Sequence, residues 1–151
     1  MNSAHRSAGR ALLAGLLSVA AMLPIRAMGA ETAAAVPRVV YHIDDTARAI
    51  PAIRNIANHL KAVPNIEIVV VALGQGVDFL LKNAKDDRGN PYEPMIDDLG
   101  LAGVEFRVCN NTLVARQIDK ERLHPDAAIV ESGVAEITRL QLSEGYAYLK
   151  P

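Results

Sequence analysis

Apolar positions along the chain follow two different spacings. Short runs that alternate apolar and polar residues, or that are rich in β-branched residues, predict strands. Longer runs with apolar residues every three or four positions predict helices. The predicted strands cover residues 38–43, 66–73, 104–109, 127–130 and 146–149. The predicted helices cover residues 47–63, 77–83, 95–101, 112–118 and 134–143.

Strand and helix therefore alternate five times, which predicts one α/β domain over residues 38–151. We expect a three-layer α/β/α sandwich around a mostly parallel five-stranded sheet. The run Ile66–Leu73 is apolar on both faces, as in a central strand. Right-handed crossovers would bring the carboxyl ends of all strands to one edge of the sheet. The residues expected at that edge are His42, Asp44, Gly74, Gln75, Cys109, Asn110 and Ser132.

Cys109 is the only cysteine, and it lies where the strand pattern changes to a helix pattern. Asn110 and Asn111 follow it, at the point where a helix needs side chains to accept its free N–H groups. The free amides and the dipole at a helix N-terminus favour a thiolate. Cys109 is therefore a candidate nucleophile. The alternative is a buried cysteine that only fills space, which is the usual state of free cysteine.

Other candidate site residues lie at the same predicted edge. His42 could exchange protons with the thiol near neutral pH, or could be held by the backbone in a structural role. We assign catalytic roles to Cys109 and His42, and ligand binding to Asn110, Asn111, Gly74 and Gln75. The turn Gly74-Gln75-Gly76 only weakly resembles a phosphate-binding turn. No clustered ligand spacing predicts a metal centre, and no cofactor is predicted.

The N-terminus has the layout of a secretory signal peptide: a basic start, an apolar stretch from Ala11 to Leu23, and small residues near Ala30. We expect residues 1–29 to be a signal peptide and residues 30–37 a flexible lead-in. The protein would then be periplasmic or secreted, with no membrane segment after cleavage. Loss of three arginines would change the formal charge from −1 to −4. With no basic stripe and few aromatic residues, nucleic acid is not an expected partner.

Several segments together resemble the DsrE/DsrF-like family, in particular its exported single-domain branch. The resemblance covers about residues 38–151. It rests on Val40–Asp44, Asn55–Leu60, Val71–Val77, Gly103–Leu113, Ser132–Ile137 and Gly145–Pro151.

The resemblance implies a three-layer α/β/α fold and assembly into a homotrimer or homohexamer. It also implies sulfur relay, in which Cys109 would carry a persulfide from a donor protein to an acceptor protein. The protein would then be a sulfur carrier or sulfurtransferase-like protein. The alternative hypothesis is a non-catalytic homo-oligomeric binding or scaffold domain in which Cys109 is structural.

Overall fold

The structure is a computed structural model that describes residues 36–151. The predicted signal peptide (residues 1–29) and most of the predicted lead-in (residues 30–37) lie outside the described residues. The strands are β1 (Arg38–Ile43), β2 (Glu67–Ala72), β3 (Glu105–Cys109), β4 (Ala127–Val130) and β5 (Ala147–Leu149). The α-helices are α1 (Ala49–Ala62), α2 (Glu93–Leu101), α3 (Asn110–Ala115) and α4 (Gly133–Glu144). Three 3-10 helices are η1 (Thr46–Arg48), η2 (Gly74–Leu80) and η3 (Lys120–Arg122).

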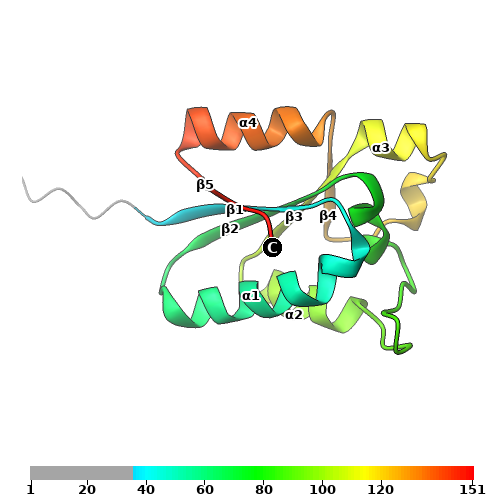
Figure 1. The fold of residues 1–151 in the computed structure, drawn as a ribbon, viewed down its shortest axis with the longest axis horizontal. Coiled ribbons are helices and arrows are strands. Elements are labelled where there is room, and N and C mark those ends of the chain that lie inside the picture. Colours follow the sequence, from blue (N-terminus) through cyan, green and yellow to red (C-terminus); the bar gives the residue numbers. More distant parts are fainter. Residues whose placement is uncertain (1–35) are drawn as a thin grey trace, which may run out of the picture. The chain divides into compact units, whose positions relative to one another are not determined.

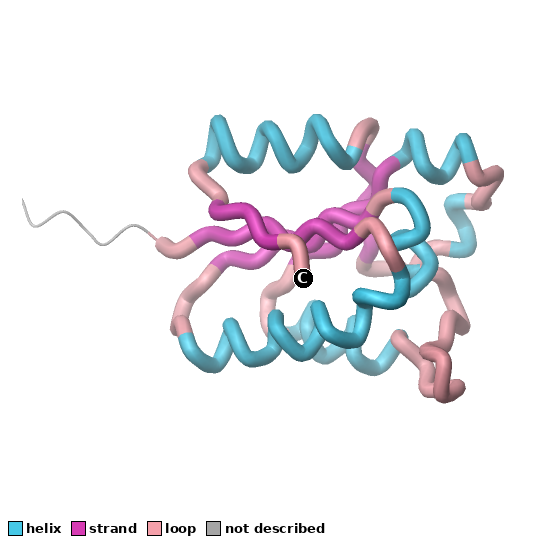
Figure 2. Tube along the Cα trace, in the orientation of Figure 1, coloured by secondary structure: helices cyan, strands magenta, loops and turns pink. Residues whose placement is uncertain are grey.

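The five strands form one sheet in the order β4-β3-β2-β1-β5. All four strand pairings are parallel. Helices α1 and α2 cover one face of the sheet, and α3 and α4 lie on the other (Figure 1). The tube view shows the same two helical layers with the strands between them (Figure 2). The predicted three-layer α/β/α fold is therefore confirmed.

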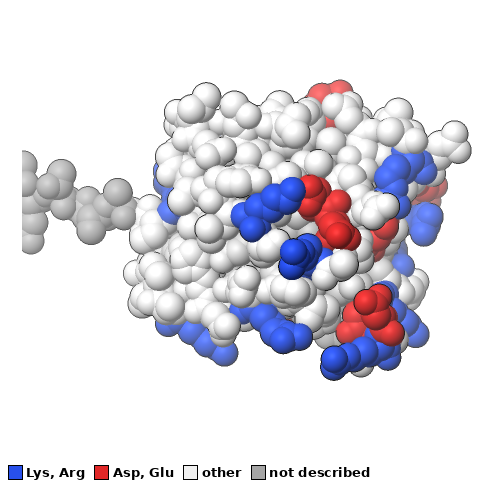
Figure 3. All heavy atoms as spheres, in the orientation of Figure 1, with Lys and Arg blue, Asp and Glu red and all other residues white. Residues whose placement is uncertain are grey.

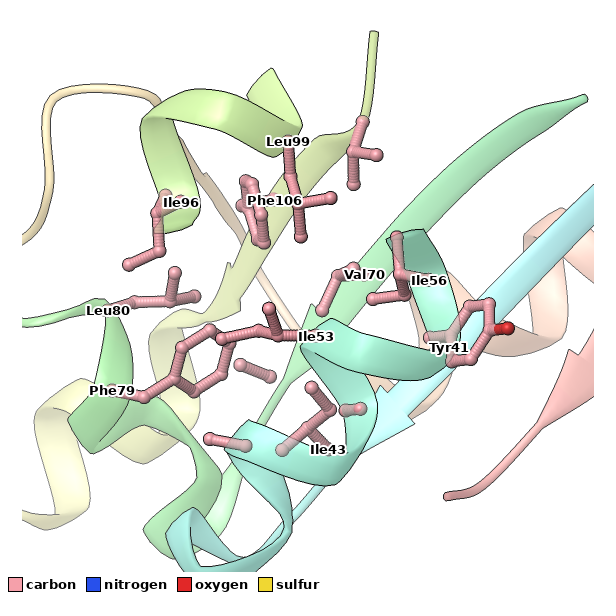
Figure 4. Packing of buried hydrophobic residues seen from close by; sticks show 14 of the residues in the cluster. Tyr41, Ile43, Ile53, Ile56, Val70, Phe79, Leu80, Ile96, Leu99 and Phe106 are labelled. Atoms are coloured by element: carbon pink, nitrogen blue, oxygen red, sulfur yellow. The ribbon is translucent and has the colours of Figure 1, made fainter. Parts of the chain in front are cut away.

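The larger core lies between the sheet and the layer of α1 and α2. Ile53 and Ile56 from α1 and Ile96 from α2 pack against alternate residues of the central strands, as Figure 4 shows. Phe79 from η2 and Phe106 from β3 meet edge to face, with ring centroids 6.4 Å apart. Each buried aromatic or branched side chain of this kind contributes about 1.5–3 kcal/mol through its burial.

The core under α4 is smaller. Its six buried residues are Val40, Val69, Val71, Ile137, Leu140 and Tyr146. Leu73 is partly buried and packs against them. Beside these residues, Arg107 of β3 reaches up to Glu136 of α4 and forms an ion pair. Their side chains are only 17% and 11% exposed, respectively. An ion pair thus takes the place of apolar packing between β3 and the first turns of α4.

The predicted element boundaries shift by a few residues. The segment expected as a helix over residues 77–83 is the 3-10 helix η2, which begins earlier, at Gly74. A Cβ added to Gly76 would lie 2.2 Å from the carbonyl oxygen of Ile43, so only glycine fits at this point. The close approach of η2 to the end of β1 explains why the turn is glycine-rich. Among residues 36–151, none of the helices combines the length and apolarity that crossing a bilayer requires.

Candidate functional site

Cys109 is the last residue of β3 and the residue that precedes the first turn of α3. Its backbone is extended, with φ −69° and ψ 114°, so the chain turns into the helix directly after it. Cys109 is paired in register with Val130, the last residue of β4. The cysteine is 6% exposed. The predicted position at the junction of a strand and a helix is confirmed, although α3 begins at Asn110 and not at Thr112.

The groups that lower the pKa of Cys109 come from two helix N-termini. Burial alone would raise the pKa of this thiol. The N–H of Gly133, at the start of α4, and the N–H and hydroxyl groups of Thr112 act in the opposite direction, as does the N–H of Asn111. Together they outweigh the effect of burial and hold the pKa of Cys109 below its ordinary value. The arrangement therefore favours a thiolate inside a largely buried site.

Thr112 is itself held in place by the turn after β2. Its hydroxyl oxygen accepts the N–H of Gly74 at 3.0 Å, which leaves the hydroxyl proton free to be donated to the sulfur. The carbonyl oxygen of Gly74 accepts a hydrogen bond from Arg116 at 2.8 Å. Arg116 also pairs with Asp78 of η2 at 2.8 Å. The N–H and the carbonyl oxygen of Gly74 are thus hydrogen-bonded to Thr112 of α3 and to Arg116, the residue after α3. These bonds hold η2 against α3 beside Cys109.

Gly133 lies directly against Cys109 because β3 and β4 are neighbours and both turn into helices at the same edge. A Cβ on Gly133 would come within 3.1 Å of the Cys109 Cβ and 3.0 Å of the Leu73 Cδ2. The side chain of Ser132 caps α4 by accepting the N–H of Ala135 at 3.5 Å. Absence of a side chain at Gly133 lets the N-terminus of α4 approach the sulfur.

The two predicted asparagines lie at the site in different ways. The N–H of Asn111 donates to the carbonyl oxygen of Glu131 at 3.3 Å and also helps to lower the pKa of Cys109. The side-chain oxygen of Asn110 is buried, and no hydrogen-bond partner for it exists among residues 36–151. Gln75, the remaining predicted ligand-binding residue, has an exposed side chain, and its carbonyl oxygen accepts the hydroxyl of Thr46. Ligand binding by these residues stays a prediction.

His42 is not brought against Cys109 within one chain. Strand β2 lies between β1 and β3, so two strand spacings of about 4.8 Å each separate the two residues across the sheet. The His42 Nδ1 lies 2.8 Å from the hydroxyl of Tyr148 in β5, and its Nε2 is buried without a partner in the described chain. Burial lowers the pKa of His42, opposed by the charge of Asp44 and reinforced by that of Lys150. Its catalytic role stays a prediction.

Thr112, Gly133 and Arg116 are site residues that were not predicted from the sequence. Gly133 had a usable signal, because Ser-Gly directly after a predicted strand opens a helix whose first turn must pack against the neighbouring strand end. The contribution of Thr112 and Arg116 depends on how η2 sits against α3, and no local pattern carries that information.

A second group of polar side chains lies near the amino end of β4, at the opposite end of this strand from Cys109. Asp97, His124 and Asp126 bring three possible metal-ligand atoms within 4.8 Å of one another. The His124 Nδ1 accepts the N–H of Asp126 at 3.2 Å, and its Nε2 lies 3.1 Å from Asp97 Oδ1. A neutral imidazole that accepts at Nδ1 carries its proton at Nε2, whereas a metal-bound histidine donates from its free nitrogen. The group is therefore better described as a hydrogen-bonded Asp–His pair that ties α2 to the segment before β4.

Comparisons with known proteins agree with this description of the fold. A family model described as the DsrE/DsrF-like family matches residues 39–151. The search of curated proteins gave no match. Residues 39–151 include every strand and helix of the domain except the first residue of β1. The family match gives the chain a sulfur-relay-type fold.

Two solved structures are similar to this chain. A protein of unknown function from Methanobacterium thermoautotrophicum, MTH1491, has 35% sequence identity and a TM-score of 0.67. The similarity covers 76% of this chain and 99% of MTH1491. The ychN protein from E. coli has 16% identity and a TM-score of 0.63, over 77% of this chain and 99% of that one. At this identity, the ychN match supports the fold alone.

Proposed function

The chain belongs to the DsrE/DsrF-like family, and on that premise we propose that it is a sulfur carrier, with Cys109 as the residue that holds the sulfur. The carried form is a persulfide on Cys109. A donor protein or a small sulfane-sulfur compound supplies the sulfur, and an acceptor thiol removes it.

The transfer needs only a thiolate, because no net oxidation or reduction occurs. The Cys109 thiolate attacks the outer sulfur of a donor persulfide, a new S–S bond forms, and the donor leaves as a thiolate. In the second step an acceptor thiolate attacks the outer sulfur on Cys109, and Cys109 leaves as a thiolate. A lowered pKa increases the thiolate fraction and makes Cys109 a better leaving group.

The observation that carries this proposal is the set of donors around the sulfur. Cys109 is largely buried, and burial by itself raises the pKa of a thiol. A cysteine that only fills space has no need of the Gly133, Thr112 and Asn111 donors that lower it. The same donors would stabilise the thiolate that forms on Cys109 when the sulfur is passed on, much as an oxyanion hole holds developing charge.

One observation favours the alternative of a binding or scaffold domain with a structural cysteine. Cys109 is only 6% exposed and lines none of the main surface hollows of the described chain. A sulfur donor would therefore have to reach the thiol through a small opening or after a local movement of the α3 and α4 N-termini.

Mass spectrometry of the native protein after incubation with inorganic polysulfide distinguishes the two functions. The carrier gains the mass of one sulfur on Cys109, and a thiol acceptor such as dithiothreitol removes it. The Cys109→Ser variant gains nothing. If the native protein stays unmodified while the denatured protein reacts, the thiol is structural and the carrier function is wrong.

A second measurement uses the rate of alkylation by iodoacetamide near pH 6. The carrier is labelled quickly at Cys109 because part of the thiol is ionised there. Labelling that requires denaturant would contradict the proposal. Since Cys109 is the only cysteine, the total label reports this one residue.

We further propose that the protein is exported and acts in the periplasm or outside the cell. The support is the basic, apolar and small-residue order of residues 1–29. Intact-mass measurement of the protein recovered from a bacterial periplasm tests this. The expected mature chain begins near Ala30, and a full-length chain retained in the cytoplasm would contradict export.

We also propose a homotrimer or homohexamer. Members of this family are often oligomeric, and large apolar side chains are strongly exposed in the single chain. The most exposed are Leu101 at 90% and Leu142 at 83%. Light scattering with size-exclusion chromatography tests the assembly, and a monomer at micromolar concentration would contradict it.

A further inference from the structure

A hollow of about 520 Å³ lies between the start of α1 and the segment that leads into α2. Its volume is in the range of small-molecule sites. It belongs to the layer of α1 and α2, whereas Cys109 is held between the N-termini of α3 and α4 on the other face of the sheet. The hollow is therefore separate from the proposed sulfur site. One wall is a stripe at helical spacing, formed by Ala47, Ile50 and Arg54.

The opposite wall is a loop that is tightly bonded to itself. The carboxylate of Asp86 accepts the backbone N–H groups of Arg88 and Asn90 and the side-chain amide of Asn90, at 2.8–3.0 Å. Lys85 pairs with Pro91 in an antiparallel bridge. The N–H of Asp86 also donates to the carbonyl oxygen of Asn90 at 2.8 Å. The wall of the hollow is thus preformed, and a ligand would not have to order it.

The charges around the hollow leave cations without acidic partners. Arg54, Lys85 and Arg88 line it, and none of the three lies within 4.0 Å of a carboxylate in the part of the chain that the structure describes. Asp86 and Asp87 line it too, so the formal sum is three positive and two negative charges. The hydrogen bonds to Asp86, chiefly from Asn90, lower the pKa of its carboxyl group and satisfy its oxygens within the loop. Figure 3 shows basic and acidic side chains close together at the lower right, where the loop before α2 lies in Figure 1.

The rest of the lining includes the polar residues Thr46 and Asn90 and the apolar side chains of Ala47, Ile50, Tyr92 and Met95. Ile50 and Met95 are half-buried, and Tyr92 is 4% exposed. Tyr92 packs edge to face on Phe79, with ring centroids 6.0 Å apart. A ligand in this hollow would therefore meet both apolar side chains and guanidinium or ammonium groups.

We propose that this hollow binds a small organic anion with an apolar body, either a carboxylate or a phosphate monoester. Arginine side chains bind both kinds of anion through paired N–H groups. The apolar surface of Ile50, Tyr92 and Met95 selects an aromatic or alkyl body over a bare inorganic ion.

The test is a ¹H–¹⁵N NMR titration of the folded protein with four probes at millimolar concentration: phenyl phosphate, benzoate, inorganic phosphate and benzyl alcohol. Phenyl phosphate or benzoate should shift the amide signals of residues 46–54 and 85–95 with saturation. The stronger of the two identifies the anionic group. Inorganic phosphate and benzyl alcohol should each bind at least about tenfold more weakly, because each lacks one half of the interaction. Equal binding of benzyl alcohol, or no saturable shifts with either organic anion, would overturn the proposal.

Variants locate the site. Arg54→Gln and Lys85→Gln should each weaken binding about tenfold, since each removes a charged donor. Arg48→Gln is the matched control, because Arg48 is an exposed arginine of η1 that does not line the hollow. If Arg48→Gln weakens binding as much as Arg54→Gln, the attraction is a general surface effect and the site is refuted. Cys109→Ser should bind the anion normally, so this result stands apart from the fate of the sulfur-carrier proposal.

Discussion

Gly133 faces Cys109 so closely that a Cβ on the glycine would lie 3.1 Å from the Cβ of the cysteine. This contact places the first N–H of α4 at the sulfur that β3 presents. Two strands that are neighbours in the sheet thus supply, at their carboxyl ends, both the thiol and a group that stabilises its charged form. Ligand sites at this edge are common in open α/β sheets.

Replacing Gly133 by alanine should raise the pKa of Cys109. The added methyl would press on Leu73 and Cys109, and the start of α4 would have to move away by a few tenths of an ångström. We expect the midpoint of the pH–alkylation curve to rise by about one unit, which lowers the thiolate fraction below the midpoint. Because a more basic thiolate is more nucleophilic, part of this loss is offset, and the alkylation rate below the midpoint should fall only about threefold. Gly100→Ala is the control, since its Cβ would meet only Asp126 at an ordinary 3.5 Å.

Replacing Thr112 by valine should raise the same pKa without changing the volume of the side chain. Valine lacks the hydroxyl that donates to Cys109 and accepts the N–H of Gly74. The orphaned N–H should also reduce the free energy of unfolding by about 1 kcal/mol, measured by urea denaturation. Thr112→Ser should retain the lowered pKa of Cys109 and the native free energy of unfolding. Thr138→Val serves as a control in α4, where the hydroxyl bonds only to the helix backbone, and an equal effect there would contradict the role of Thr112.

The lowered pKa of Cys109 predicts a pH-dependent contribution to stability. Because the folded value lies below the unfolded one, the thiolate stabilises the fold above the unfolded value of about 8.5, and this contribution is lost as the pH falls through the folded value. The unfolding free energy of the native protein minus that of Cys109→Ser should therefore increase as the pH rises through this window. A difference that is constant with pH, or that decreases as the pH rises, would show that the thiol is not perturbed in this direction.

Replacing Arg107 by methionine should destabilise the fold by about 2 kcal/mol. Glu136 would keep its partner Arg139 but lose the cation on its buried side. Hydrogen bonds to arginine, first to Arg139 and then to Arg107, lower the pKa of Glu136, so this stabilisation is lost as the pH falls through the folded value. Arg38→Met is the control, because its pair with Glu67 is exposed and should be worth less than about 1 kcal/mol. Urea denaturation at neutral pH compares the two variants.

The sequence predicted the fold because local signals agreed with the tertiary structure. The β-branched run at Ile66–Leu73 indicated a central strand, and β2 lies in the middle of the sheet. Apolar spacing located all four α-helices, although the predicted second helix, η2, is a 3-10 helix pressed against Ile43 through Gly76.

The candidate site was predicted less completely, because it depends on strand order. Cys109 could be placed at a strand end from its own neighbours in sequence. The contact between Cys109 and Gly133 requires β4 to lie beside β3. The separation of His42 from Cys109 requires β2 to lie between β3 and β1. Neither relationship follows from the local spacing of residues in a strand.

The near-complete burial of Cys109 has a consequence for how a loaded carrier would behave. A persulfide extends the side chain by one S–S bond of about 2.05 Å. Gly133 lies against the cysteine, Leu73 lies against Gly133, and Cys109 is only 6% exposed, so little space is left for an added atom. Loading would therefore require the residues around the junction of β3 and α3 to move apart.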